Sequence, residues 1–174
     1  MGRTSKTEAF VLKKKSLLNK DSLIFLLTKE QGKTVVTAKG VKKITSRRSP
    51  HLETGNLIFA VFNKKNDRLY LQETKLISGF SELKEVQDKV SKLYKFFFVL
   101  EKLLPENQKE EVVYNLTKSF LVKLSKSASN YDILTVYFNK LLRVLGYTKQ
   151  SHDIIELEAI ISDLINEKMP SFNI

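Results

Sequence analysis

The fold is decided by one stretch near the N-terminus, Thr28-Lys-Glu-Gln-Gly-Lys-Thr-Val-Val-Thr-Ala-Lys-Gly-Val-Lys-Lys-Ile-Thr-Ser-Arg-Arg48. It predicts a tight turn at Gln31-Gly32, a strand over residues 33–41 and a second break at Gly40. Gly32 suits a turn position that requires a positive φ, and Gly40 lets the backbone come close to a ligand. The stretch therefore indicates a strand–turn–strand unit followed by an irregular segment.

The segment after Gly40 is basic, with Lys42, Lys43, Arg47 and Arg48 spaced by Ile44, Thr45 and Ser46. Lysine and arginine in such a setting hold phosphates without reading bases. A solvated loop that is basic by chance is the alternative, because charge runs often serve only solubility. The rest of the chain bears on the choice between these two interpretations.

Further strands are predicted on both sides of this stretch, over residues 7–17, 22–28, 57–62 and 68–77, with a polar hairpin loop at 63–67. The run 22–28 is apolar on both faces, which is typical of a strand covered on both sides. Residues 45–56 read as irregular, with room for a short helical turn. Turn signals between short strands favour a small barrel or a sandwich.

At Ser78-Gly79 the apolar period changes from strand to helix. One helix is expected from Ser81 to just before Pro105, and three more near residues 107–125, 131–145 and 153–168. The third of the four is apolar around much of its surface, so we expect it at the centre of the bundle. Five strands followed by four helices give an α+β fold class, with domains predicted at 1–80 and 81–174.

The positive charge is concentrated in the N-terminal part. The chain of 174 residues has a formal net charge of +11. Residues 1–50 hold 13 basic and 3 acidic residues, whereas residues 81–174 hold 13 of each. Such asymmetry indicates a polyanionic partner, with nucleic acid as the first candidate and an anionic membrane as the second.

The cysteine count and the apolar runs limit where the protein works. There are 0 cysteines, which excludes disulfides and thiolate metal sites. The longest apolar cluster, residues 96–100, is far too short to span a bilayer, and the N-terminus has no signal-peptide pattern. We therefore expect a cytoplasmic protein without a membrane partner.

Patterns typical of catalytic sites are weak in this sequence. Gly32-Lys33-Thr34 is similar to the end of a phosphate-binding P-loop, but Leu27 occupies the position of the first glycine and a strand follows instead of a helix. The two histidines, His51 and His152, lack metal-ligand spacing. No enzyme activity, cofactor or metal is expected. Tyr70 could stack on a base, and a buried barrel aromatic is the alternative.

Several of these pieces occur together, in order, in one family. They are Thr28-Lys-Glu-Gln-Gly32, Ala38-Lys-Gly40, Ser46-Arg47 and Leu141-Leu-Arg-Val-Leu-Gly-Tyr147. The order resembles the bacterial recombination mediator RecO, with its "T-x-E-x-G" turn, "A-K-G", basic "R-R-x-x-S-R" tail and later "L-L-x-x-L-G-Y". The match covers roughly residues 7–147.

The resemblance implies an N-terminal five-stranded OB-fold β-barrel followed by an all-helical domain. It implies binding of single- and double-stranded DNA, strand annealing, and loading of RecA together with RecR-like and SSB-like partners, in the cytoplasm at the nucleoid. Two departures stand out. Many members carry a cysteine-based zinc motif after "L-G-Y", where this chain has Thr148-Lys-Gln-Ser-His152, so no zinc is expected. The chain is also short for the family.

In an OB-fold the ligand face is built around the second and third strands and their flanking loops. The nucleic-acid-binding residues expected on this basis are Lys13, Lys14, Lys15, Lys33, Lys39, Lys42, Lys43, Arg47 and Arg48. An RNA- or ribosome-associated OB-fold protein is the alternative, because the same barrel and charge bind RNA. A nucleic-acid hydrolase is the third class, disfavoured by the lack of a metal or nucleophile constellation.

Overall fold

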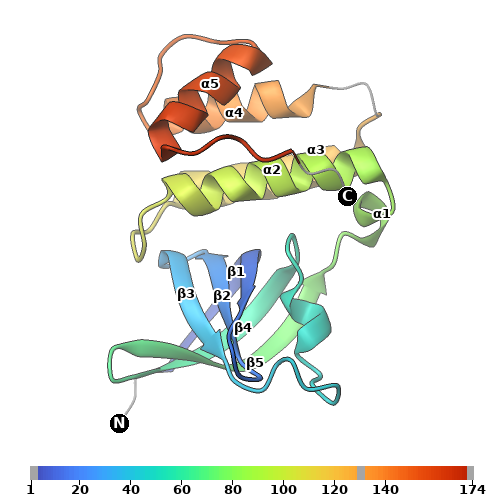
Figure 1. The fold of residues 1–174 in the computed structure, drawn as a ribbon, viewed down its shortest axis with the longest axis vertical. Coiled ribbons are helices and arrows are strands. Elements are labelled where there is room, and N and C mark those ends of the chain that lie inside the picture. The colour runs from blue at the N-terminus through green and yellow to red at the C-terminus, as the bar shows by residue number, and fades with distance from the viewer. Residues whose placement is uncertain (1–3, 129–131, 172–174) are drawn as a thin grey trace. The chain divides into compact units, whose positions relative to one another are not determined.

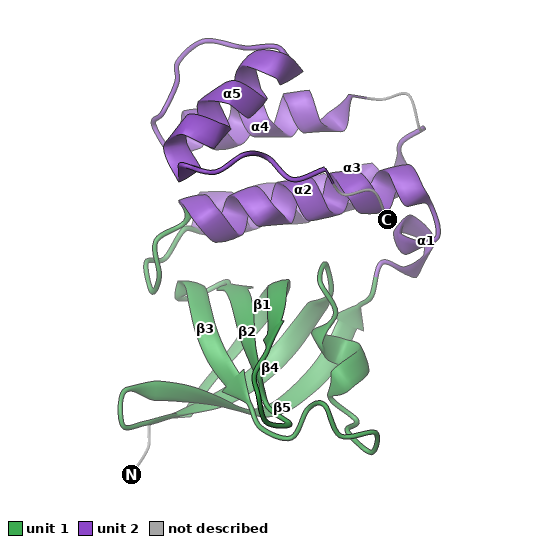
Figure 2. Ribbon diagram, viewed as in Figure 1, with its two compact units in different colours: residues 1–79, 104–110 green, residues 80–103, 111–174 purple. Residues whose placement is uncertain are grey.

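The computed structural model describes residues 4–128 and 132–171. The chain forms two compact units: Met1–Gly79 with Leu104–Glu110, and Phe80–Leu103 with Glu111–Ile174 (Figure 2). The boundary near Ser78-Gly79 lies where the period of the sequence changes. The sequence did not indicate that the chain returns to the first unit at 104–110.

The first unit is a closed five-stranded barrel in the order β1-β2-β3-β5-β4 (Figure 1). Its strands are β1 (Thr4–Ser16), β2 (Ser22–Thr28), β3 (Gly32–Ala38), β4 (Leu57–Lys65) and β5 (Arg68–Ser78). β3 and β5 pair in parallel through Thr37 and Tyr70, and the other pairs are antiparallel. A barrel followed by helices confirms the predicted α+β class and its OB-fold half.

Alternating side chains fill the barrel. The core cluster includes Val11, Ile24, Val36, Ile58 and Phe62, each fully buried. A register shift between Val11 and Lys13 marks a bulge in β1, and a bulge bends a strand and increases its twist. The barrel thus closes around one apolar interior.

Three predicted strand boundaries were wrong. β1 begins at Thr4 and not at residue 7. β3 ends at Ala38 and not at residue 41, because Gly40 has φ +64° and donates its N–H to Asp21 Oδ1 at 2.8 Å. β4 continues through the expected loop 63–67 to Lys65, which pairs with Arg68. The turn consists of Asn66 and Asp67 alone, both at positive φ, as two-residue hairpin turns of type I′ require.

The segment 104–110 packs on the barrel at the β2–β3 turn. The N–H of Asn107 donates to the carbonyl oxygen of Lys33 at 2.7 Å, and Glu106 forms a parallel bridge with Lys33. Gly32 has φ +69°, and a Cβ placed there would lie 1.7 Å from the carbonyl oxygen of Gln108. Glycine is therefore required at 32 for its φ and for this close approach.

The second unit contains the helices α1 (Ser81–Lys84), α2 (Gln87–Leu103), α3 (Glu111–Lys126), α4 (Ile133–Val144) and α5 (Ile154–Ile165). The single helix expected from Ser81 is broken, because the chain makes a tighter turn there, with Val86 N–H bonded to Leu83 O. α3 begins four residues later than expected, since Asn107 has φ +57° and belongs to the barrel unit.

α4 lies in the core of the helical unit, as predicted. Tyr137, Phe138, Leu141 and Leu142 are fully buried. The rings of Phe96 and Phe120, from α2 and α3, stack with centroids 4.1 Å apart. Between residues 4 and 128 and between 132 and 171, no helix is long and apolar enough to cross a membrane.

Candidate nucleic-acid interface

One outer face of the barrel combines apolar and basic side chains. Residues opposite each other on neighbouring strands share a face of the sheet. Two cross-strand rows result: Lys15, Leu23, Thr37 and Tyr70, and beside it Lys13, Phe25 and Val35. We call these seven residues the outer face.

The side chains of the outer face point away from the barrel interior. Ile24 and Val36, which alternate with them, are fully buried in the core. Leu23, Phe25 and Val35 are only half-buried. The sequence interpretation that β2 is covered on both sides was therefore wrong for this part of the strand, and apolar surface remains open to a ligand.

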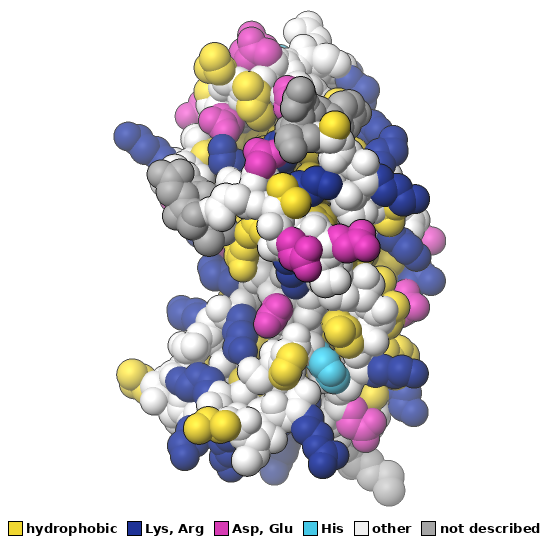
Figure 3. Space-filling view, turned by 90° about the vertical axis from the view of Figure 1, so that its right-hand side faces the viewer, with side chains coloured by type: hydrophobic (Ala, Val, Ile, Leu, Met, Phe, Trp, Pro, Cys, Tyr) yellow, Lys and Arg dark blue, Asp and Glu magenta, His cyan; other side chains and the backbone are white. Residues whose placement is uncertain are grey.

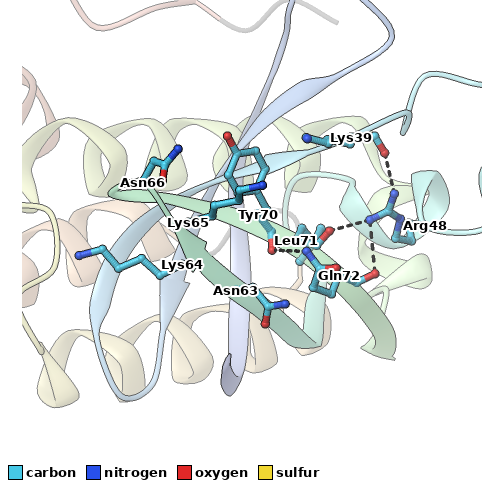
Figure 4. A pocket seen from close by; sticks show the side chains of 9 residues that line it. All are labelled: Lys39, Arg48, Asn63, Lys64, Lys65, Asn66, Tyr70, Leu71 and Gln72. Atoms are coloured by element: carbon cyan, nitrogen blue, oxygen red, sulfur yellow. Dashed lines mark hydrogen bonds between the residues drawn. The ribbon is translucent and has the colours of Figure 1, made fainter. Parts of the chain in front are cut away.

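The outer face leads into two hollows that meet at Lys39 and Tyr70. The first has a volume of about 600 Å³ and is lined by Leu23, Val35 and Arg68 among others. The second, of about 1070 Å³, lies against the β4–β5 hairpin and includes Lys64 and Lys65 (Figure 4). Lys39 and Tyr70 line both.

At this junction the Lys39 ammonium lies 4.7 Å from the centroid of the Tyr70 ring. On β1 and β2, Lys13 Nζ lies 5.5 Å from the ring of Phe25 in the same way. A cation over an aromatic face is held by the quadrupole of the ring. Each pair places a positive charge beside a ring that is half-buried, which is the combination that single-stranded nucleic acid uses for phosphate and base contacts.

Arg48 joins the segment after β3 to β5. Its Nη2 donates to the carbonyl oxygen of Lys39 at 2.6 Å, and its Nη1 to those of Leu71 at 2.8 Å and Gln72 at 3.4 Å (Figure 4). β3 and β5 share a single register pair, so these bonds extend the barrel closure beyond the end of β3. Arg48, which itself lines the second hollow, thus supports its wall.

Lys42 ties the same segment to the β1–β2 loop, residues 17–21. Its ammonium donates to the carbonyl oxygen of Leu17 at 2.6 Å, and its backbone N–H to that of Lys20 at 3.1 Å. The bond from Gly40 N–H to Asp21 Oδ1 joins the two loops a third time. These three hydrogen bonds hold the start of the basic segment against the β1–β2 loop.

The nine expected residues occupy different settings. Lys13, Lys15 and Lys39 lie on or beside the outer face, and Lys43 and Arg47 are exposed on the neighbouring segment. Lys14 Nζ donates to Ser49 Oγ at 3.4 Å. Lys33 is only 8% exposed and lies where the 104–110 segment pairs with β3.

Five residues on or near the outer face were not among those expected from the sequence: Lys20, Phe25, Lys64, Lys65 and Arg68. The sequence does carry a signal for three of them, because Lys64, Lys65 and Arg68 cluster around one hairpin turn. Figure 3 shows another side of the molecule, where lysine and arginine side chains also gather at the lower end of the barrel.

The two histidines stabilise local structure. His51 Nδ1 lies 2.9 Å from Thr74 Oγ1, and His152 lies between Thr148 Oγ1 at 3.0 Å and Glu156 Oε2 at 3.2 Å. Within the described part of the chain, no three His, Cys, Asp or Glu side chains come together as a metal-binding group.

Comparison with known proteins gives a consistent answer. Residues 1–80 match the family model described as Recombination protein O N terminal. The DNA repair protein RecO of Thermoanaerobacter sp. is 29% identical over 149 residues, which are 85% of this chain and 60% of that protein. The proteins of the same name from Caldanaerobacter subterraneus and Listeria welshimeri are each 28% identical, over 83% and 81% of this chain and 59% and 55% of their own length.

The chain thus spans less than two thirds of the relatives that it matches. The match to the family model covers the whole barrel, and the similarity continues through most of the helical unit. The resemblance predicted from the sequence is confirmed: residues 1–80 match the N-terminal model of the RecO family, and the chain is similar to DNA repair proteins RecO over most of its length.

Proposed function

We propose that this protein is a non-enzymatic recombination mediator that binds single- and double-stranded DNA, anneals complementary strands and, with RecR-like and SSB-like partners, helps to load RecA during DNA repair. The names of its relatives support the repair role. The observation that carries the DNA-binding step is the outer face of the barrel, where half-buried apolar side chains stand between lysines.

A single strand fits this face by its two kinds of contact. Bases stack on Phe25 and Tyr70, because every base has a π-face whatever its identity. Phosphates lie against Lys13, Lys15 and Lys39, whose charges do not distinguish sequences. Binding is therefore expected to be independent of sequence and sensitive to salt.

Annealing follows from the same charge arrangement. Two DNA strands repel each other through their phosphates, and a protein that neutralises part of one backbone lowers that repulsion. Lys64 and Lys65, on the hairpin beside the second hollow, offer cations to the incoming strand. Annealing requires that some bases of the bound strand stay accessible to the incoming strand. The two hollows beside Tyr70 are open to solvent and leave room for this.

The test combines binding and annealing. Fluorescence anisotropy with matched DNA and RNA 30-mers, a length chosen as roughly twice the largest OB-fold site, measures the preference. Annealing of complementary DNA strands, followed by energy transfer between end labels, measures the activity. Tighter DNA binding and faster annealing than without protein are the expected results.

Two outcomes would overturn the proposal. Clear preference for RNA without annealing would favour an RNA- or ribosome-associated OB-fold protein. Shortening of labelled strands in the presence of magnesium or manganese, abolished by chelation, would indicate a nuclease. Repeating the annealing with SSB-coated strands tests the partner step, because a mediator acts on strands that are already covered.

A further inference from the structure

Two large aliphatic side chains stand fully in solvent at the same end of the barrel. Leu18, in the β1–β2 loop, and Ile44, in the segment after β3, have relative exposures of 109% and 106%. Single exposed aliphatic residues are common and need no explanation. These two differ because their loops are joined by hydrogen bonds from Lys42 to Leu17 and Lys20.

The surroundings of this pair are basic. Lys15, Lys20, Lys43 and Arg47 are exposed on the same two loops and their flanks, whereas the one acid, Asp21, accepts hydrogen bonds from Gly40 and Asn19. Figure 3 shows isolated apolar side chains protruding among basic ones at the lower end of the barrel. Exposed apolar side chains surrounded by positive charge favour a partner with an anionic surface and an apolar interior.

The pair also lies at the end of the proposed strand path. Leu17 and Asn19, the neighbours of Leu18, line the same hollow as Leu23 and Tyr70. A strand that occupies the outer face therefore reaches the β1–β2 loop. A flat lipid surface could meet the two tips, but it could not enter the hollow beside them, so the contiguity favours nucleic acid over an anionic membrane.

We propose that Leu18 and Ile44 form an apolar wedge that enters the base stack where a single strand on the outer face continues into duplex. Leucine and isoleucine are among the side chains that proteins insert between base steps, at the expense of local stacking. The inference rests on the proposed function and extends it by naming the DNA form: a junction between single strand and duplex.

The test uses the full chain and a DNA hairpin with a single-stranded tail, on the 5′ side in one probe and the 3′ side in another. 2-Aminopurine replaces adenine in the base pair next to the tail, and its fluorescence rises when it is unstacked. A rise with at least one of the two probes, and none when 2-aminopurine sits in the middle of the duplex, is the expected result.

Leu18→Ala/Ile44→Ala should abolish the rise and weaken junction binding about tenfold, which corresponds to about 1.4 kcal/mol. Its affinity for a tailless single strand should stay within about twofold, because the outer face is intact. The matched control is Val112→Ala/Ile155→Ala, which removes two exposed aliphatic side chains from α3 and α5 and should behave as wild type.

Leu18→Lys/Ile44→Lys separates apolar insertion from charge. It adds two positive charges, so a purely electrostatic contact would bind the junction more tightly, whereas a wedge loses the fluorescence rise. Loss of the rise supports the proposal, and its persistence overturns it.

Failure of the inference is distinct from failure of the proposed function. Single-strand binding by wild type without any rise at either junction overturns the wedge alone. Absence of single-strand binding overturns the proposed function. Binding to phosphatidylglycerol vesicles that is lost in the alanine pair, with no rise at the junctions, would assign the two tips to a membrane surface instead.

Discussion

The guanidinium of Arg48 donates to the carbonyl oxygen of Lys39 at 2.6 Å, across the turn that follows β3. The same group reaches Leu71 and Gln72 on β5. Arg48 therefore bonds to backbone on both sides of the single parallel pairing that closes the barrel. An arginine that the sequence assigns to phosphate binding has a structural task here.

Arg48→Ala should lower the free energy of unfolding by about 1–3 kcal/mol. This is the range expected when backbone carbonyl oxygens lose their hydrogen bonds from a charged donor. Arg48→Lys should recover only part of this loss, because an ammonium cannot reproduce the planar fork of a guanidinium. Urea denaturation followed by circular dichroism measures both variants.

The neighbouring Arg47→Ala is the matched control, since Arg47 is exposed. Its free energy of unfolding should stay within about 0.5 kcal/mol of wild type, as for most surface substitutions. Equal stability of the alanine variants at 47 and 48 would contradict the structural role of Arg48.

Gly32→Ala tests the docking of residues 104–110 on the barrel. The added Cβ would lie 1.7 Å from the carbonyl oxygen of Gln108, so the segment must move away. Gly146→Ala is the control, because Gly146 also has a positive φ, +81°, but no atom of the described residues lies within 4 Å of its Cβ position.

Both substitutions carry the backbone strain of a left-handed alanine, about 1–2 kcal/mol. Gly32→Ala should lose about 1–3 kcal/mol more through the clash. It should also raise hydrogen exchange at the amide of Asn107, whose bond to Lys33 O would break. Equal losses at the two positions would show that the contact with Gln108 contributes nothing.

The sequence predicts those strands and helices whose own apolar residues repeat with the spacing of that element. β2 and α4 were placed within two residues because Ile24 and Leu26, or Tyr137 and Leu141, repeat at the spacing of their elements. The 104–110 segment could not be predicted, because its conformation depends on a hydrogen bond from Asn107 to a carbonyl distant in sequence.

The candidate site could be predicted only in part, because some of its features depend on contacts between residues distant in sequence. Clustered charge reveals that the barrel end is basic, but it does not reveal which cations bind backbone carbonyls, as Arg48 and Lys42 do. Phe25 was missed because an apolar residue on an apolar strand reads as core. Its half-buried setting comes from the closed barrel, which turns it outward beside Lys13.

Tyr70→Ala should weaken single-strand DNA binding about tenfold, within the range of about 1–3 kcal/mol for one stacked base. Tyr70→Phe should bind like wild type, because the ring and not the hydroxyl makes the stack. Tyr147→Ala removes a tyrosine that is 48% exposed in the helical unit and should have no effect. Fluorescence anisotropy at one fixed salt concentration compares the three, and a wild-type affinity for Tyr70→Ala would remove this ring from the interface.

Lys43→Glu/Arg47→Glu tests whether the segment after β3 contacts phosphates. The double substitution should weaken DNA binding for every sequence alike, because phosphate contacts carry no base information. Log affinity of the wild type should fall linearly with log salt, with a slope of about −0.7 for each phosphate neutralised on a single strand. Loss of two contacts should therefore make the slope shallower by about 1.4.

Lys118→Glu/Lys123→Glu on α3 is the matched control, with the same change in net charge at two exposed positions. It should lower affinity only through the general field and leave the slope unchanged. The melting temperatures of both variants should stay near that of wild type, because exposed charges contribute little to folding. If the two double substitutions shift affinity and slope equally, net charge alone governs binding, and the segment after β3 is a solvated loop.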